Sequence, residues 1–208
     1  MCIRDSHGIN RSGVVAGDSV MVIGAGPIGA LSIAALVSRG IGPVIAVEPA
    51  ERRRQLARDL GASEVLAPAD LETFPAWEPE RIAKRAVHVV LECSGKKPAM
   101  EAGFHQLLRG GTLALVGAGI EPPTFDPNRF ILNELSVVGS FVYDQGGFEA
   151  ALELLATDGF PTGLLIEEGE VSLEGLSGAL AGLARGEFAG KVMVVPGHRV
   201  EPSTAGGA

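Results

Sequence analysis

The sequence predicts an α/β fold, a doubly wound parallel sheet with helices on both faces. Three observations lead to it: short apolar runs alternate with helical segments, a glycine-rich turn joins the first run to the first helix, and an acidic residue closes the second run. Runs that are apolar throughout fit strands covered on both sides, as in parallel sheets. Strands that alternate with helices pair in parallel through right-handed crossovers.

The elements follow in order from the spacing of apolar residues. The run at residues 20–23 has strand length, and beyond Gly29 apolar residues recur at helical spacing until Gly40, which suits a helix C-cap. The same rhythm predicts strands at residues 44–47, 64–66, 87–91, 112–116 and 135–142, and helices at residues 50–60, 80–85 and 99–108. A helix at 148–156, a glycine-rich helix at 173–185 and a strand at 191–195 follow, and the tail at 197–208 is expected to be flexible.

Composition and charge exclude several classes of partner. The net charge of −8 argues against nucleic acid, because phosphate neutralisation needs clustered Lys and Arg, and residues 52–54 form the one such run. No stretch approaches the roughly 18 apolar residues of a membrane span and the start is polar, so we predict no membrane partner and a cytoplasmic location. Two cysteines without CxxC, HExxH or paired-His spacing predict neither a disulfide framework nor a metal site in this chain.

The turn after the first strand reads Gly24-Ala25-Gly26-Pro27-Ile28-Gly29. In a dinucleotide-binding loop the first glycine permits the tight turn, the second leaves no Cβ to block a pyrophosphate, and the third lets helix and strand pack closely. The helix N-terminus offers free N–H groups to the anion, and Pro27 suits a position that needs no donor. A glycine-rich turn without a ligand is the alternative, but the strand before and the helix after it favour the Rossmann dinucleotide-binding fold.

Glu48 closes the second strand, 19 residues after Gly29. At this place a carboxylate can accept hydrogen bonds from the adenosine ribose hydroxyls. NADP carries a phosphate on that ribose, and the Glu48 carboxylate would repel it. Each pair of like unit charges would cost roughly 4 kcal/mol at about 4 Å and an effective dielectric near 20. We therefore predict NAD rather than NADP. Any of the arginines at residues 52–54 could swing toward such a phosphate, although a solvated helix face is the simpler interpretation for at least two of them.

Further motifs keep the order and spacing of one enzyme family. They are Gly17-Asp18-Ser19-Val20, Ala46-Val47-Glu48, Leu60-Gly61-Ala62, Leu91-Glu92-Cys93-Ser94-Gly95, Arg109-Gly110-Gly111-Thr112, Val116-Gly117, Gly139-Ser140 and Gly190-Lys191-Val192. With the glycine loop they resemble the medium-chain, zinc-dependent alcohol dehydrogenase family, in particular its threonine, sorbitol and butanediol dehydrogenase members, over about residues 7–196.

The resemblance implies a role for individual residues along one bound cofactor. The pyrophosphate would be held by Gly26, Pro27, Ile28 and Gly29 behind the turn at Gly24, and the adenosine ribose by Glu48 and Arg53. Cys93 and Ser94 would lie along the cofactor, and the nicotinamide carboxamide would contact the backbone at Val116, Gly117, Ala118, Ser140 and Val142. Lys191 resembles a basic residue that approaches the pyrophosphate. These positions fall at or beyond strand carboxyl ends, where open α/β sheets bind ligands; for Cys93 a small buried residue is a second, compatible interpretation.

The chain departs from the family at its start. The family's catalytic zinc domain has no counterpart here, and residues 161–196 are interpreted as a segment returning toward that absent domain, after a Rossmann domain at residues 7–160. Residues 1–6 look foreign or disordered and resemble translated sequencing adapter, which predicts a truncated reading frame. None of His7, His88, His105 and His198 has partners at ligand spacing, so we expect neither a catalytic residue nor a metal ligand in this chain.

In a complete enzyme the resemblance implies hydride transfer between a small alcohol and NAD, with zinc polarising the alcohol oxygen. We therefore predict that this chain alone binds NAD(H) without oxidising alcohols. A stand-alone NAD-binding redox sensor and a fragment of a zinc-free quinone oxidoreductase are the alternatives. The loop spacing disfavours a methyltransferase, and Tyr143 lacks the lysine four residues on that a short-chain dehydrogenase needs. The resemblance also suggests a homo-oligomer in which an edge strand at residues 135–142 pairs across a two-fold axis.

Overall fold

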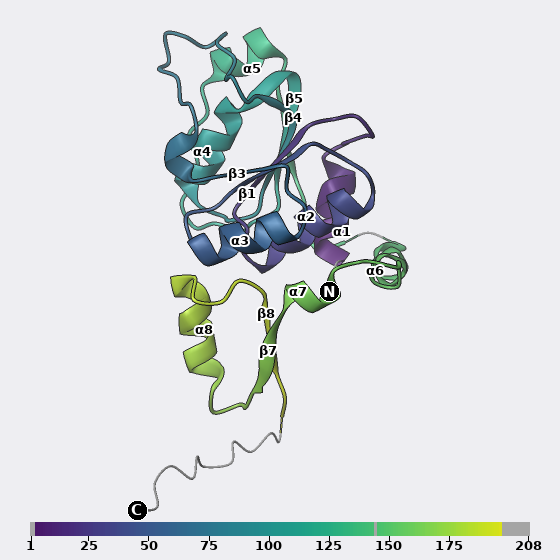
Figure 1. Ribbon diagram of the computed structural model, residues 1–208. Coiled ribbons are helices and arrows are strands. Elements are labelled where there is room, and N and C mark those ends of the chain that lie inside the picture. The colour runs from purple at the N-terminus through teal and green to yellow at the C-terminus, as the bar shows by residue number, and fades with distance from the viewer. Residues whose placement is uncertain (1–2, 144, 197–208) are drawn as a thin grey trace, which may run out of the picture.

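The computed structural model describes residues 3–143 and 145–196. Its main body is a six-stranded parallel sheet with the strand order β3-β2-β1-β4-β5-β6 (Figure 1). The strands are β1 (Val20–Ile23), β2 (Val44–Val47), β3 (Glu64–Leu66), β4 (Val87–Glu92), β5 (Leu107–Leu115) and β6 (Ser136–Gly139). The chain runs from β1 to one edge and then from β4 to the other, so the predicted doubly wound sheet is confirmed.

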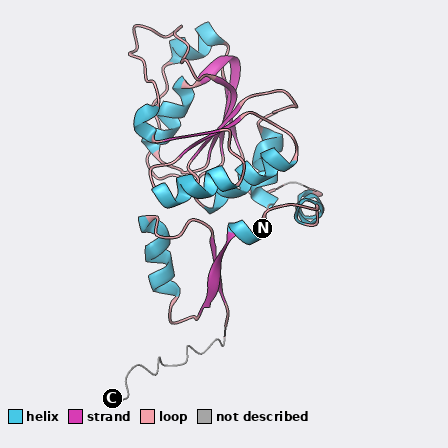
Figure 2. Ribbon diagram, in the orientation of Figure 1, coloured by secondary structure: helices cyan, strands magenta, loops and turns pink. Residues whose placement is uncertain are grey.

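Helices cover both faces of this sheet (Figure 2). They are α1 (Ile3–Arg11), α2 (Pro27–Ser38), α3 (Glu51–Asp59), the short 3-10 helix η1 (Pro68–Asp70), α4 (Lys97–His105), α5 (Pro127–Asn133) and α6 (Gly147–Leu155). Among the described residues, no helix is long and apolar enough to cross a membrane.

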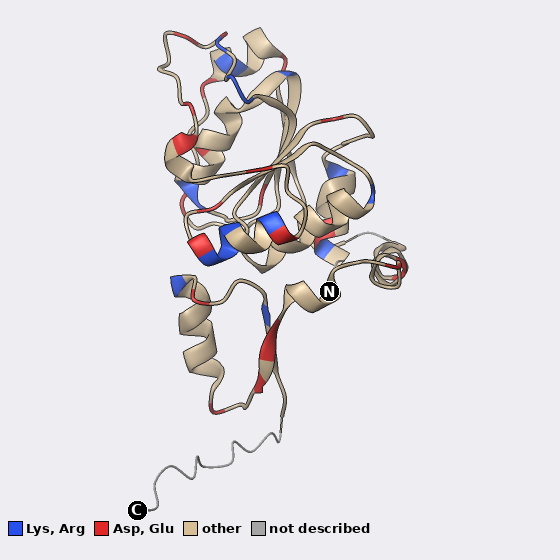
Figure 3. Ribbon diagram, viewed as in Figure 1, with Lys and Arg blue, Asp and Glu red and all other residues tan. Residues whose placement is uncertain are grey.

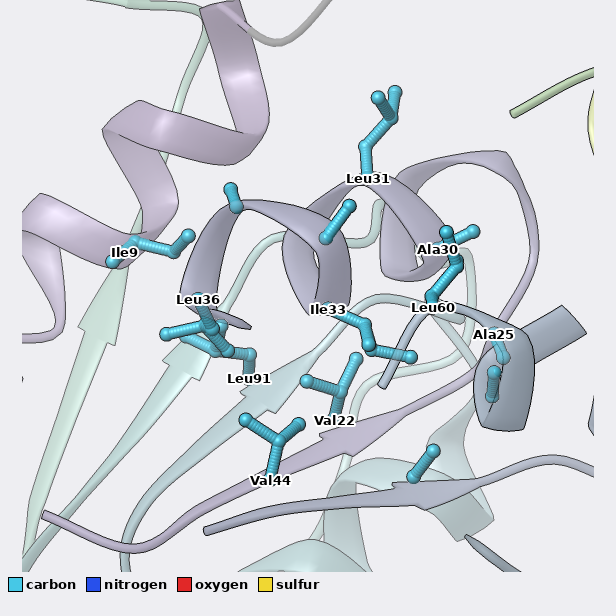
Figure 4. Packing of buried hydrophobic residues seen from close by; sticks show 14 of the residues in the cluster. Ile9, Val22, Ala25, Ala30, Leu31, Ile33, Leu36, Val44, Leu60 and Leu91 are labelled. Atoms are coloured by element: carbon cyan, nitrogen blue, oxygen red, sulfur yellow. The ribbon is translucent and has the colours of Figure 1, made fainter. Parts of the chain in front are cut away.

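Successive side chains of β1 enter two apolar cores, one on each face of the sheet. Val22 packs with Leu91 beneath α2 (Figure 4), whereas Met21 belongs to the opposite core with Phe104 of α4. All four residues of β1 are buried. Burial from both sides explains why this strand is apolar at every position instead of at alternate ones.

The C-terminal part forms a smaller unit beside α3 (Figure 1). It comprises α7 (Thr162–Leu165), β7 (Ile166–Val171), α8 (Leu176–Arg185) and β8 (Lys191–Val194), with β7 and β8 paired in parallel. Arg52 of α3 holds this unit through an ion pair with Glu167 at 2.7 Å and a hydrogen bond to the carbonyl oxygen of Glu187 at 2.9 Å. Figure 3 shows the basic residues on α3 and the acidic residues along β7.

The structure corrects several predicted boundaries. No helix forms at residues 80–85, where Arg129 binds the carbonyl oxygens of Pro79 and Arg81 at 3.1 and 2.7 Å and holds the chain in turns. The strand predicted at residues 135–142 is limited to the four residues of β6. Elements α5, α7 and β7 were not anticipated from the sequence.

The predictions for the two ends of the chain have different outcomes. Residues 3–6, expected to be foreign or disordered, are part of α1, and Asp5 and Ser6 are buried. The predictions for residues 1–2 and for a flexible tail at 197–208 lie outside the described residues.

Candidate functional site

The carboxyl ends of β1, β2 and β4 surround a cavity of about 700 Å³. It lies at the point where the sheet order reverses between β1 and β4, the place where open α/β sheets bind ligands. The structure brings together here six of the predicted site residues: Gly24, Gly26, Glu48, Arg53, Cys93 and Ser94. Thr73, Lys96 and Ala99 also line the cavity and were not anticipated, because they stand in no motif.

Each of the three glycines of the loop is required for a different structural reason. Gly24 has a φ of +88°, and a Cβ there would lie 2.9 Å from the Cβ of Ser94. A Cβ on Gly29 would overlap the carbonyl oxygen of Gly24, so the loop closes onto α2 only without it. Gly26 has no such contact, since a Cβ would come no nearer than 3.7 Å to the Arg53 guanidinium. Gly26 therefore presents bare backbone to the cavity.

Helix α2 begins directly after this loop, and the backbone N–H groups of its first turn have no acceptor within the helix. Pro27 occupies the first helical position, and the first hydrogen bond of the helix runs from the Ala30 amide to the Gly26 carbonyl oxygen at 2.8 Å. The amides of Ile28 and Gly29 precede that bond. Free amides and the positive end of the helix dipole favour an anion at this position.

Glu48 fixes the loop as well as lining the cavity. Its side chain is almost fully buried, and one carboxylate oxygen accepts from the Ala25 amide at 2.8 Å while the other accepts from the Ala50 amide at 3.0 Å. Sequence reasoning had given Glu48 only a ligand-binding role. A carboxylate oxygen has two lone pairs, so these bonds leave acceptor capacity for a ligand hydroxyl.

The arginines next to Glu48 have protein partners. Arg53 donates to the carbonyl oxygens of Phe188 at 3.0 Å and Leu183 at 2.7 Å. Arg54 donates to the carbonyl oxygen of Glu48 at 2.8 Å and to that of Pro49. Together with Arg52, they tie α3 to the C-terminal unit and to the end of β2 instead of forming a merely solvated face.

A second cavity of about 360 Å³ lies beyond β5 and β6. Its lining includes all five residues that were predicted there, namely Val116, Gly117, Ala118, Ser140 and Val142. The hydroxyl of Ser140 is buried and has no hydrogen-bond partner within the part of the chain that the structure describes. The oxygen has almost no exposed surface and packs beside Gly8 of α1, so the backbone of Ser140 is the part of the residue that a ligand in this cavity could contact.

The residues at the end of β4 differ in chemistry. Burial raises the pKa of the Cys93 thiol, so this cysteine is protonated at neutral pH and unsuited to act as a nucleophile. Glu92 is completely buried, and burial also raises the pKa of its carboxyl group, against hydrogen bonds from Ser94 and Gly95 that lower it. Glu92 stands in one of the family motifs, and the sequence alone predicts no role for it.

Lys191 is not brought to either cavity. It begins β8, and its charge acts on Asp5 of α1, whose pKa burial raises to about 7 and nearby cations lower. Among the described residues, no three His, Cys, Asp or Glu side chains converge where they could hold a metal ion. The side chains that the structure describes therefore do not supply a ligand set for zinc.

Known proteins share this architecture. Residues 27–157 match the family model described as zinc-binding dehydrogenase. D-xylulose reductase A of Aspergillus oryzae is 33% identical over 156 residues, which are 73% of this chain and 43% of that protein. The chain thus spans less than half the length of this curated relative.

Solved structures agree with the sequence relatives. A zinc-binding dehydrogenase from Sinorhizobium meliloti bound to NADP has a TM-score of 0.76 at 27% identity, covering 93% of this chain and 56% of that one. The 2R,3R-butanediol dehydrogenase of Bacillus subtilis has a TM-score of 0.72 at 26% identity, covering 88% and 53%. The sheet matches the cofactor-binding domains of medium-chain dehydrogenases, as the sequence resemblance implied. The chain belongs to the zinc-binding dehydrogenase family.

Proposed function

We propose that this chain is an NAD(H)-binding domain in which the dinucleotide spans the two cavities at the carboxyl end of the sheet. The observation that carries the proposal is the arrangement of Gly26 and Glu48. Bare backbone faces the large cavity in front of the α2 N-terminus, and a buried carboxylate lies at the end of the neighbouring strand β2. A pyrophosphate fits the first feature and a ribose diol the second.

The opposite end of the dinucleotide fits the second cavity. The nicotinamide carboxamide offers both a donor and acceptors, which can pair with backbone groups of the residues that line this cavity. When bound, NAD supplies hydride transfer at its nicotinamide ring. The residues from Val116 to Ala118 and at Ser140 would orient that ring.

The preference for NAD over NADP rests on Glu48 and its neighbours. A phosphate on the adenosine ribose would meet the buried carboxylate, which protein amides already hold in place. The arginines of α3 that could offset this repulsion are bound to carbonyl oxygens and to Glu167. One structural relative is bound to NADP, which makes NADPH the competing cofactor to titrate against NADH.

The whole enzyme is proposed to transfer a hydride between a small alcohol and NAD, since the curated relative is a D-xylulose reductase. This chain covers less than half of that relative, and the described residues form no metal site. We therefore propose that the chain alone binds NAD(H) without oxidising alcohols. A cytoplasmic location and a homo-oligomer formed through the edge at residues 135–142 stay predictions.

Calorimetric titration with NADH, NADPH and AMP tests the proposal. We expect saturable NADH binding at one site, weaker NADPH binding, and no NADH production from NAD and simple polyols. Binding of NADPH more tightly than NADH would contradict the cofactor assignment, and alcohol-dependent reduction of NAD by the purified chain would contradict the expected inactivity.

A further inference from the structure

The turn that follows β4, residues 93–96, separates the two cavities; we call it the β4 turn. Cys93 and Ser94 line the large cavity, whereas Gly117 and Ala118, on the other side of the turn, line the small one. β4 lies between β1 and β5 in the sheet. A ligand that fills both cavities must therefore cross the β4 turn.

The β4 turn has no space to shift toward either side. Toward the glycine loop, a Cβ on Gly24 would lie 3.0 Å from the Ser94 amide nitrogen. Toward the small cavity, a Cβ on Gly95 would overlap the carbonyl oxygen of Ala118, and Gly95 has a φ of +68°. The backbone is thus packed directly against the chain segments that line both cavities.

Glu92 holds this turn from below with its buried carboxylate. One oxygen accepts from the Ser94 amide at 2.8 Å and from the Ser94 hydroxyl, and the Gly95 amide donates to both oxygens at 3.1 and 3.0 Å. The main-chain carbonyl of the same residue accepts from the amides of Val116 at 2.9 Å and Gly117 at 2.8 Å. One residue therefore binds the β4 turn and the first residues of the small cavity together.

We propose that Glu92 is a positioning residue for the dinucleotide. It touches neither cavity, yet its carboxylate sets the position of the β4 turn between them and so the affinity for a ligand that spans both. Hydrogen bonds to a buried carboxylate are stronger than those to neutral acceptors, which suits a group that must hold a backbone in place. This inference rests on the proposed binding of NAD(H) across the two cavities.

The inference predicts different effects on ligands of different length. AMP would occupy the large cavity alone, where its phosphate and ribose face Gly26 and Glu48, and the Glu92 carboxylate makes no hydrogen bond with either residue. NADH reaches over the β4 turn into the small cavity, and it should bind less tightly once the turn is released. A general loss of stability would weaken both ligands alike.

The experiment compares Glu92→Ala, Glu92→Gln and a matched control, Glu101→Gln. Glu101 lies on α4, and its carboxylate accepts a hydrogen bond from the Thr124 backbone amide at 2.8 Å and pairs with Lys97, without a hydrogen bond to the β4 turn. We expect the Kd for NADH to rise at least about tenfold in Glu92→Ala, about threefold in Glu92→Gln, which keeps one acceptor oxygen, and not at all in the control, while the Kd for AMP stays within about twofold.

Amide hydrogen exchange provides a readout that needs no ligand. The Ser94 and Gly95 amides should exchange faster in both Glu92 variants and stay unchanged in Glu101→Gln, so Glu92→Gln decides the matter if Glu92→Ala does not fold. Unchanged NADH affinity in a folded Glu92 variant, or an equal loss for AMP and NADH, would overturn the inference. A wild-type chain that binds no NADH would instead defeat the proposed function.

Discussion

The carboxylate of Glu48 accepts a hydrogen bond from the backbone amide of Ala25 at 2.8 Å. This bond ties the end of β2 to the glycine loop after β1, so a single side chain both shapes the loop and lies in the proposed cofactor cavity. Because Glu48 has both roles, a substitution there should change both the stability of the chain and its affinity for the cofactor.

Glu48→Ala should lower both stability and NADH affinity. It leaves the Ala25 and Ala50 amides without their acceptor, at a cost of about 1–3 kcal/mol for each buried donor left unpaired. We expect a lower midpoint in thermal unfolding and a Kd for NADH raised at least about tenfold. Glu48→Gln should retain part of the stability and narrow the difference between NADH and NADPH. An NADPH affinity that falls further than the NADH affinity in Glu48→Gln would refute this role.

Gly29→Ala should damage the loop, because the added Cβ overlaps the carbonyl oxygen of Gly24. The matched control is Gly178→Ala in α8, where a Cβ meets nothing within 4 Å. Overpacking costs about 1–3 kcal/mol, whereas alanine for glycine inside a helix gains about 0.5–1 kcal/mol. In urea unfolding, the free energy of unfolding should therefore fall for Gly29→Ala and rise for Gly178→Ala. Equal changes in the two variants would contradict the packing described for the loop.

Arg53→Ala should loosen the C-terminal unit from α3. The change removes the hydrogen bonds to the Phe188 and Leu183 carbonyl oxygens. Faster amide exchange across residues 183–190 and a lower thermal midpoint are expected. Arg58→Ala serves as control, since the exposed Arg58 side chain bonds only to side chains of α3 and such surface pairs contribute about 1 kcal/mol or less. Identical exchange in Arg53→Ala and Arg58→Ala would show that Arg53 does not anchor this unit.

Asp5 should contribute stability that is lost as the pH rises from about 4 to 7. Burial raises the pKa of this carboxyl group from its ordinary value of 3.8 to about 7, so the folded state holds a proton that the unfolded state has already lost. The stabilisation is complete below pH 3.8 and disappears as the pH passes the folded value. A difference of about three pKa units corresponds to at most about 4 kcal/mol. Urea unfolding between pH 4 and 8, compared between the unmodified chain and Asp5→Asn, measures it.

The raised pKa of Glu92 acts in the same direction as that of Asp5. Asp5→Asn should flatten the pH dependence and raise stability at pH 8 relative to the unmodified chain. A pH dependence of stability that is the same in Asp5→Asn as in the unmodified chain would contradict the burial described for Asp5.

The sequence was informative where one physical rule controlled one segment. The strand β1, the turn after it and the position of Glu48 at the end of β2 follow the prediction, because parallel strands need covering on both faces and the turn requires glycine at fixed spacing. The cofactor-binding roles of these residues stay predictions. The residues grouped around the small cavity were placed by family resemblance rather than by any local pattern.

Other features depend on contacts between distant residues. The expected helix at 80–85 fails where Arg129, about fifty residues away in the chain, binds its carbonyl oxygens. The structural role of Glu92 is visible only once its carboxylate is seen beneath Ser94 and Gly95. Helical periodicity and motif spacing cannot predict the contact of Arg129 with residues 79 and 81, or that of the Glu92 carboxylate with the turn above it.

Calorimetric titration of the wild-type chain with NADH tests the central claim most directly. The arrangement of Gly26, Glu48 and Ser140 predicts saturable binding of one NADH per chain, tighter than that of NADPH and of AMP. Absence of any heat of NADH binding across a full titration, with a sample shown to be folded by circular dichroism, would contradict it.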